Sequence, residues 1–376
     1  MSGDRLHSLD ALRGLSMLMI IGFDYLVIAL AKAWPAPLTQ ILAEQFQHVP
    51  WHGFHLYDLV FPLFIFVSGA TLALKPLSFA EQPWSLRKPY YRKLLLRVLL
   101  LVLLGIVYNH GWGKGLPTSW DEVRYASVLA RIGIAWGIAA LIVWHCSLRQ
   151  QLMIGTAILL GYPLLQWLGG VWLSEQHQCV EGWLSAACSL NAFVDQQWLP
   201  GIRYRDAPVD PEGLLSQIPA VFNALAGYWT TRWLMQYQQS KQARQLAMLA
   251  IGIIVAMFTA LLASIFYPFN KTLWTTSFAL LTSALSALLL LGFFLMIDRL
   301  QWKQWAKPLY WIGYNALLIY LLTALFNWGY PVNSIFGQWI ELLNMSWQTV
   351  AHISLILLLQ LLLLRFLFHK RWSLSL

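Results

Sequence analysis

The sequence predicts an all-α fold: a polytopic membrane protein with about ten transmembrane helices. Of its 376 residues, 59% are hydrophobic and only 11% are charged, whereas a soluble domain carries about 25% charged residues. Apolar runs of about 20 residues, the length that crosses a bilayer as a helix, recur along the chain. The mean hydropathy of +0.58 agrees with this class. We expect residues 1–376 to form a single transmembrane domain.

The first apolar run, residues 11–33, is too long for a signal-peptide core, and no small-residue cleavage site follows it, so it is interpreted as a retained helix. Turn-forming segments separate the runs that follow, among them "WPAP", "KPLSFAEQPW" and "GWGKGLP". The predicted spanning helices are 11–33, 54–75, 94–110, 125–146, 152–173, 214–236, 246–267, 273–297, 309–329 and 347–369.

The charge distribution predicts the orientation. Most of the 25 lysines and arginines fall on the side of the membrane that holds the N-terminus, and positive loops mark the cytoplasmic side. Both termini are therefore predicted to be cytoplasmic, and the longest loop, 175–212, to be periplasmic. This pattern also accounts for the net charge of +9 without nucleic acid, since the chain has no zinc-finger spacing and no basic amphipathic arm.

Two cysteines, Cys179 and Cys188, lie in this outer loop. In an oxidising compartment they could form a disulfide, although two nearby cysteines are a weak signal.

Several charged residues lie in segments predicted to be apolar, where each costs about 2–3 kcal/mol or more and needs a reason. Asp10 and Arg13 share one face at the start of the first helix, either as an ion pair or with Arg13 placed to bind a phosphate. Asp24 lies near the middle of the same helix. It either has a buried partner or handles protons or a substrate amine.

Arg124 and Arg131 are seven residues apart, so they lie on one face of the fourth predicted helix. They are either neutralised by buried acids such as Asp24 or Asp58, or they form the positive wall of a cavity for an anionic ligand. Asn315 is a polar group in an apolar helix and should find a partner.

The segment "FQHVPWHGFHLYDLVFP", residues 46–62, carries three histidines and an aspartate at the outer edge of the membrane. His52, His55 and Asp58 follow at three-residue steps, so a helix would stack them on one face. His48 precedes Pro50 and belongs to a loop. The set could bind zinc, but the pattern is loose. The alternative is that one imidazole performs acid–base or nucleophilic chemistry.

Six segments occur in one order along the chain: "RLHSLDALRGL", "HVPWHGFHLYDLVFPLFIFVSG", "SWDEVRYASVLARIG", "VDPEGLLSQIPAVFNALAG", "NKTLWTTSF" and "GYNALLIY". Together they resemble the heparan-α-glucosaminide N-acetyltransferase family of transmembrane acetyltransferases, in its bacterial branch linked to N-acetylglucosamine use. The resemblance covers nearly the whole chain. It implies transfer of an acetyl group from cytoplasmic acetyl-CoA, as co-substrate, to the amine of a glucosamine-type sugar on the periplasmic side of a bacterial inner membrane.

The resemblance also implies residue roles. It makes His48 the catalytic histidine, and it places Asp24 where the family has a catalytic asparagine. It strengthens the expectation of a Cys179–Cys188 disulfide. Asp58 is expected either to orient an imidazole or to cap a helix, and no metal is expected. Charge and position, independently of the resemblance, give two further sets of residues. Residues expected to bind the cofactor are Asp10, Arg13, Arg124, Arg131 and Asn315, and those expected to bind the sugar are His52, His55, Glu212, Asn270 and Lys271. The alternative for Glu212, Asn270 and Lys271 is helix capping and interface anchoring, and Asn315 could instead lock two helices together.

Three questions stay open from the sequence. The acetyl group could pass directly to the amine or through an acetyl-histidine. A transporter or sensor for amino sugars, or an O-acyltransferase of a surface glycan, could share this fold. A homodimer is a further possibility that the family resemblance favours.

Overall fold

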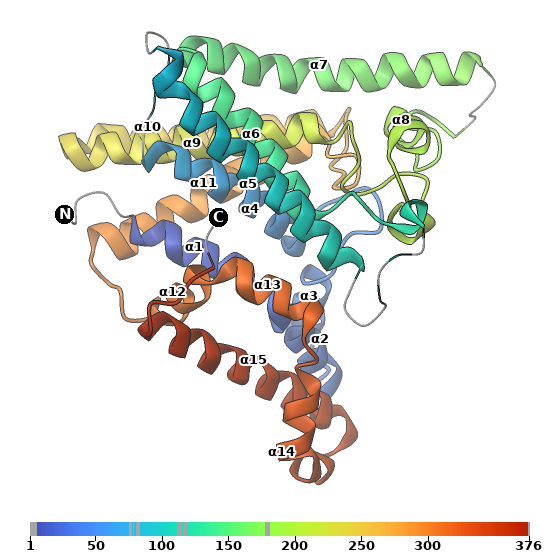
Figure 1. Ribbon diagram of the computed structural model, residues 1–376, viewed down its shortest axis with the longest axis vertical. Coiled ribbons are helices and arrows are strands. Elements are labelled where there is room, and N and C mark those ends of the chain that lie inside the picture. The colour runs from blue at the N-terminus through green and yellow to red at the C-terminus, as the bar shows by residue number, and fades with distance from the viewer. Residues whose placement is uncertain are drawn as a thin grey trace. The chain divides into compact units, whose positions relative to one another are not determined.

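The computed structural model in Figure 1 describes residues 6–74, 77, 79, 83–110, 115, 117, 119–176 and 181–374. Over these residues the regular structure is helical, apart from one isolated bridge between Arg124 and Gly201. The α-helices are α1 (His7–Leu18), α2 (Asp24–Ala33), α3 (Pro37–Gln45), α4 (Val60–Leu74), α5 (Trp84–His110), α6 (Val128–His145), α7 (Leu148–Glu175), α8 (Leu190–Trp198), α9 (Gln217–Ser240), α10 (Ala243–Ser264), α11 (Thr276–Phe293), α12 (Lys307–Tyr314), α13 (Ala316–Leu325), α14 (Gly329–Glu341) and α15 (Met345–His369).

Shorter helical segments join several of these helices. Two are π-helical, η1 (Met19–Phe23) and η5 (Phe294–Arg299), and three are 3₁₀-helical, η2 (Leu56–Leu59), η3 (Trp120–Glu122) and η4 (Tyr204–Asp206). Because η1 joins α1 to α2 and η2 joins directly to α4, each of these pairs makes one longer helical stretch.

The prediction of an all-α polytopic membrane protein is confirmed. Among the described residues, seven helical stretches are long and apolar enough to cross a membrane, or eight if the bent pair α12 and α13 forms one span. The predicted helix 94–110 lies within α5, and the predicted helix 214–236 corresponds to α9, which begins later, at Gln217, and ends at Ser240. These two do not meet the same test of length and composition. The number of spans and the location of the termini remain predictions.

The chain divides into two compact units. The first contains Met1–Pro50, His55–Phe61 and Leu289–Leu376, and the second contains Trp51–Phe54 and Pro62–Leu288.

In the first unit, α1 and α12 lie side by side because two glycines let their backbones approach closely (Figure 1). A Cβ atom on Gly14 would lie 1.9 Å from the carbonyl oxygen of Leu309, and one on Gly313 would lie 2.2 Å from that of Asp10. Any larger residue would push the helices apart. Small residues at such crossings are typical of helices that pack in membranes.

In the second unit, two glycines allow the same close approach between α4 and α9. A Cβ atom on Gly69 would lie 1.9 Å from the carbonyl oxygen of Ala224, and one on Gly227 would lie 1.9 Å from that of Phe66. Helix α6 also packs against α9. This close packing leaves little room for polar side chains, so those that are buried there need specific partners.

Candidate active site

His48 and Asp58 form a close pair in the first unit. The Nδ1 atom of His48 lies 2.7 Å from Oδ1 of Asp58. The Asp58 side chain is 2% exposed, whereas that of His48 is 51% exposed. Because an ionised carboxylate only accepts, the hydrogen lies on Nδ1, and this assigns the lone pair of the ring to Nε2. An imidazole held in this way can accept a proton or attack an electrophile through Nε2.

Backbone N–H groups hold the second oxygen of the Asp58 carboxylate, the one that does not contact His48. Oδ2 of Asp58 accepts from the backbone N–H of His55 at 3.1 Å and from that of Val49 at 3.4 Å. The first of these bonds caps η2, where α4 begins. The two roles expected for Asp58 as alternatives, orienting an imidazole and capping a helix, therefore occur together, one on each oxygen.

His55 has different partners. It lies just before η2 with an extended backbone, its Nδ1 donates to the carbonyl of Gln47 at 3.1 Å, and its Nε2 lies 3.9 Å from Oε1 of Glu44. The helix expected to stack His52, His55 and Asp58 on one face is therefore wrong, because the helical segment begins only at Leu56.

Asp24 also lies in the first unit, where the first helical stretch is interrupted. Gly22 adopts φ +132° within η1, and α2 begins at Asp24. This φ is open to glycine and rare for other residues. The Asp24 carboxylate therefore lies at the first residue of α2, directly after this irregular segment. Local π-helical segments of this kind are common at functional sites.

Tyr57 connects Asp24 with the histidine pair. Its hydroxyl donates to the Asp24 carboxylate, which also interacts electrostatically with His48. The Tyr57 ring lies against the His48 ring, with 4.7 Å between their centroids. Asp24 is 6% exposed, and its Oδ1 has no hydrogen-bond partner among the described residues. A buried carboxylate oxygen without a partner costs free energy, and the expected role of Asp24 toward a substrate or a proton stays a prediction.

In the second unit, two residues expected to bind the sugar lie together. Asn270 is buried, and its Oδ1 accepts from the backbone N–H of Leu273 at 2.8 Å. Its Nδ2 lies 3.4 Å from Nδ1 of His52, which therefore accepts the bond. Burial lowers the pKa of His52. Lys271 is half-buried in the turn that follows Asn270.

In the second unit, Arg124 is held in an ion-pair network with Asp210 and Glu212. Its Nη2 lies 2.7 Å from Oδ1 of Asp210 and 2.5 Å from Oε2 of Glu212. Burial lowers the pKa of Arg124, but the two carboxylates raise it by more. Both Arg124 and Glu212 thus have structural partners in this network, and their expected roles toward cofactor and sugar stay predictions.

Asp195, on α8, organises the same region. It accepts from the backbone N–H of Asp210 at 3.1 Å and from that of Leu214 at 2.9 Å. Burial raises the pKa of Asp195 to about 6 against these two bonds, which lower it. The predicted loop 175–212 is therefore ordered where it is described, with α8 inside it.

Arg131 is fully buried in α6. Its Nη2 donates to the carbonyl of Gly213 at 3.2 Å and to the Ser216 hydroxyl, and its guanidinium lies 4.7 Å from the centre of the Trp274 ring. A positive charge packed on an aromatic face in this way is stabilised by the ring. Its expected role as a wall of an anion cavity stays a prediction.

The remaining residues expected to bind the cofactor lie in the first unit. Arg13 Nη1 is 3.9 Å from Oδ1 of Asp10, and the Arg13 side chain is 31% exposed. Asn315 lies between α12 and α13. Its amide donates to the carbonyl of Trp372 at 2.9 Å and accepts from the N–H of Leu374 at 3.2 Å, which fixes the C-terminal segment. The sequence predicted that the side-chain amide of Asn315 would find a partner, and its partners are the backbone groups of Trp372 and Leu374.

Two further expectations concern a disulfide and a metal site. Cys188 is buried and disulfide-bonded, and Cys146 is free. Cys179 lies outside the described residues, so the pairing stays a prediction. Within the described part of the chain, no group of three or more His, Cys, Asp or Glu residues is arranged to hold a metal ion.

Sequence reasoning missed Tyr57, Asp195 and Asp210. Tyr57 was missed because aromatic residues are common at membrane interfaces. The one signal that could have found it is that it directly precedes Asp58. Asp195 and Asp210 lie in a long polar loop, where acidic residues are usually solvated. Their burial could not be read from the pattern, although Asp210 lies only two residues from Glu212.

Two comparisons with known proteins bear on this geometry. No family model matches the chain. The chain is 24% identical to heparan-alpha-glucosaminide N-acetyltransferase from Homo sapiens over 373 residues, which cover 87% of this chain and 54% of that protein. It is 25% identical to the same enzyme from Mus musculus over 368 residues, which cover 85% of this chain and 53% of that protein. The chain thus spans about half the length of these relatives. The resemblance indicated by the ordered motifs is therefore confirmed: over most of its length, the chain is similar to the heparan-α-glucosaminide N-acetyltransferases.

Proposed function

We propose that the chain is a transmembrane acetyltransferase. It moves an acetyl group from cytoplasmic acetyl-CoA to the amine of a glucosamine-type sugar on the periplasmic side of a bacterial inner membrane. The observation that carries the proposal is the pair of His48 and Asp58, whose 2.7 Å contact assigns a lone pair to Nε2 of a half-exposed imidazole. The similarity to N-acetyltransferases supports the reaction class.

The reaction breaks the C–S bond of the thioester and forms a C–N bond. A sugar ammonium must first lose a proton, because only the neutral amine attacks a carbonyl carbon. Nε2 of His48 accepts that proton, and Asp58 stabilises the resulting imidazolium. The second proton of the amine passes to the departing CoA sulfur. In a two-step variant, Nε2 attacks the thioester first and carries the acetyl group to the amine.

Asp24 contributes a negative charge next to this imidazole. Its buried Oδ1, without a partner among the described residues, suits a substrate ammonium or the proton that it releases. Tyr57 holds the other side of the carboxylate and packs on His48, so one side chain orients both groups.

Acetyl-CoA supplies the activated acetyl group, and its nucleotide end carries phosphates that basic residues recognise. Arg13 suits a phosphate because its side chain is about one-third exposed, which leaves the guanidinium accessible. Arg131 does not suit a phosphate equally well, since its guanidinium is fully buried on Trp274.

A second function, an amino-sugar transporter or sensor, is favoured by one feature. Asp24 stands where the related enzymes are expected to have an amide, and a buried carboxylate is well suited to bind a cation without chemistry. Uptake of labelled glucosamine into proteoliposomes in the absence of acetyl-CoA would support this reading, whereas dependence on acetyl-CoA would exclude it.

The direct test uses purified protein in liposomes, radiolabelled acetyl-CoA and glucosamine. We expect labelled N-acetylglucosamine from the unaltered chain and none above background from His48→Ala. His369→Ala is the matched control, because His369 is an exposed histidine at the end of α15. An active His48→Ala variant would overturn the proposal. A product that hydroxylamine cleaves would be an ester and would indicate O-acylation instead.

The sidedness has its own test. Gln47 is exposed next to His48, so a Gln47→Cys variant of a chain without Cys146 can be labelled with an impermeant maleimide. Labelling in intact spheroplasts is expected. Protection there, with labelling only after lysis, would place His48 on the same side as acetyl-CoA and contradict transfer across the membrane.

A further inference from the structure

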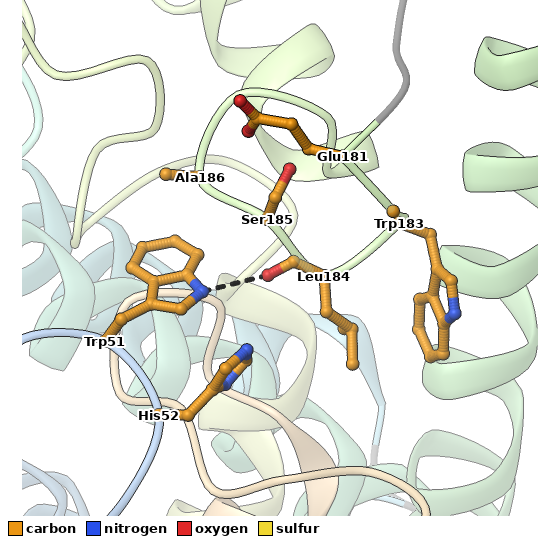
Figure 2. Close-up of a pocket in the computed structure, with 8 residues that line it drawn as sticks. Trp51, His52, Glu181, Trp183, Leu184, Ser185 and Ala186 are labelled. Atoms are coloured by element: carbon orange, nitrogen blue, oxygen red, sulfur yellow. Dashed lines mark hydrogen bonds between the residues drawn. The ribbon is translucent and has the colours of Figure 1, made fainter.

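The first half of α5 carries a basic surface that the proposed reaction does not use. The second unit also has a cavity of about 380 Å³, formed by Trp51, His52 and the turn 181–186 (Figure 2), but it contains His52, which is already expected to bind the sugar. Basic residues recur along the start of α5, and residues 82–120 contain no aspartate or glutamate. This part of the chain therefore attracts anions. The basic residues are Arg87, Lys88, Arg92, Lys93 and Arg97.

One side of α5 is packed against α6. A Cβ atom on Gly137 of α6 would lie 3.0 Å from the Val98 side chain, so the two helices touch there. Arg97 lies on the same side, with its guanidinium 4.0 Å from the centre of the Trp136 ring of α6. An aromatic face stabilises a cation in this position. The last of the basic residues, Arg97, thus has a partner inside the second unit.

The opposite side of α5 is exposed, and it changes from basic to apolar along the helix. Lys88 and Arg92 are followed by Leu95, Leu99 and Leu103, and all five side chains are exposed. Steps of four, three, four and four residues keep them on one face of a helix. In the part of the chain that the structure describes, neither Lys88 nor Arg92 pairs with a carboxylate. We call this set of five residues the α5 stripe.

Aromatic rings mark the depth of the basic end. Trp84 is stacked on Tyr91, with centroids 5.4 Å apart, and the Tyr91 hydroxyl lies 2.5 Å from Nε2 of His145. Tryptophan and tyrosine prefer the boundary between membrane and water. Because these rings belong to the same turns of α5 as Lys88 and Arg92, they favour a position of both cations at the level of the lipid headgroups.

We propose that the α5 stripe binds an anionic phospholipid such as phosphatidylglycerol, with the phosphate on Lys88 and Arg92 and one acyl chain along Leu95, Leu99 and Leu103.

The stripe matches such a lipid in charge and in length. Arginine and lysine bind phosphate oxygens through charge-assisted hydrogen bonds. From Arg92 to Leu103 the helix rises about 16 Å at 1.5 Å per residue, and one leaflet of the hydrocarbon core is about 15 Å thick. A phosphatidylcholine headgroup carries its own ammonium and gains less from the two cations.

A second copy of the chain fits the stripe less well. Two copies related by a two-fold axis would place the same face of each at the interface. The cations of one copy would then lie at the level of those of the other, and like charges repel. Charge complementarity therefore favours an anionic lipid.

The experiment titrates the purified chain in a neutral detergent with phosphatidylglycerol or with phosphatidylcholine of the same acyl chains. Bound lipid is measured by native mass spectrometry. The variant Lys88→Gln/Arg92→Gln is compared with Lys241→Gln/Arg244→Gln, which also removes one exposed lysine and one exposed arginine, at the junction of α9 and α10.

We expect the unaltered chain and the control variant to bind phosphatidylglycerol more tightly than phosphatidylcholine. Lys88→Gln/Arg92→Gln should lose about tenfold or more in affinity for phosphatidylglycerol, since each cation near a headgroup contributes to binding. The charge-preserving variant Lys88→Arg/Arg92→Lys should bind as the unaltered chain does. Equal losses in the stripe variant and the control would show a diffuse attraction to positive charge and overturn the proposal.

Two further measurements identify the occupant. Glycerol 1-phosphate, which has the headgroup phosphate and no acyl chains, should not displace the lipid even in large excess; displacement would mean a site for free phosphate. The photoreactive residue p-benzoylphenylalanine at position 99, in liposomes of both lipids, should give an adduct with the mass of phosphatidylglycerol. A cross-linked pair of chains would show instead that a second copy covers the stripe.

Thermal melts in detergent without added lipid show whether each variant is folded. We expect equal melting temperatures, because the substituted side chains are exposed.

Discussion

The Nδ1 atom of His48 lies 2.7 Å from Oδ1 of Asp58, while the other oxygen of the same carboxylate caps the helical segment that begins at Leu56. One buried aspartate thereby ties the orientation of an imidazole to the start of a transmembrane helix. We therefore expect a change at Asp58 to affect both folding and chemistry, to an extent that depends on the substitution.

Asp58→Asn separates these effects. The amide keeps an oxygen that can accept from the His55 N–H, but it removes the charge that stabilises a protonated His48. We expect a fall in kcat of about 10²- to 10⁴-fold with a change of melting temperature of only a few degrees. Asp58→Ala, the comparison, should lose the activity and also about 1 kcal/mol from the missing cap. Full activity in Asp58→Asn would mean that the pair has no catalytic role.

Tyr57→Phe tests the connection between Asp24 and His48. The variant keeps the ring against the imidazole and removes the hydroxyl that binds Asp24. We expect kcat to fall about tenfold, the effect of one hydrogen bond to a charged group, with a shift of the pH–rate profile. The control, Tyr25→Phe, changes an exposed tyrosine next to Asp24. An unchanged pH profile in Tyr57→Phe would contradict a positioning role.

Asp24→Asn should lower activity and raise stability. A buried carboxylate oxygen without a partner costs free energy, so a neutral amide of the same shape is expected to stabilise the fold by about 1 kcal/mol or more. Loss of the charge beside His48 should reduce kcat about 100-fold. Thermal melts test the expected rise in stability, and kinetics on the same preparation test the expected fall in kcat. If the variant retains full activity, an amide suffices here and the carboxylate is not needed for the reaction.

The stability of the region that Asp195 holds together, α8 and residues 210–214, should depend on pH. Burial raises the pKa of Asp195 from 3.8 to about 6 in the folded chain. Between these two pH values the unfolded carboxyl has lost its proton and the folded one keeps it, so stability falls as the pH rises from about 4 to about 6 and is constant above that. The loss amounts to about 3 kcal/mol.

Asp195→Asn lacks this titration. The difference in unfolding free energy between the unaltered chain and the variant, measured by denaturation in detergent, should therefore favour the unaltered chain more at pH 4 than at pH 7. If the difference in unfolding free energy does not vary between pH 4 and pH 7, the raised pKa of Asp195 in the folded chain is refuted.

Arg124→Ala should destabilise the chain by about 3 kcal/mol or more, because it leaves the buried carboxylate of Asp210 and the partly buried one of Glu212 without their cation. The control is Arg149→Ala, which removes an exposed arginine at the start of α7 and should change stability by less than about 1 kcal/mol. Melting temperatures of the two variants test the prediction. Equal melting temperatures would show that the ion-pair network is not structural.

The sequence by itself determined the class of the protein. Apolar runs longer than a soluble core needs predicted helices through a membrane, because backbone groups in lipid must be satisfied within the helix. The same logic marked Asp24, Arg131 and Asn315, since a polar group in an apolar run is visible without coordinates. The ordered motifs predicted the similarity to the heparan-α-glucosaminide N-acetyltransferases that the comparison then confirmed.

Only the tertiary structure decided what each of these groups contacts. His48 and Asp58 meet because a turn places Oδ1 of the aspartate on the imidazole, while a helical spacing rule had predicted a stack of His52, His55 and Asp58. The hydrogen bond between Tyr57 and Asp24 likewise joins residues that are far apart in the sequence. Contacts of this kind depend on the directions of side chains after the backbone has turned, and the order of residues along a chain carries no such information outside a regular helix.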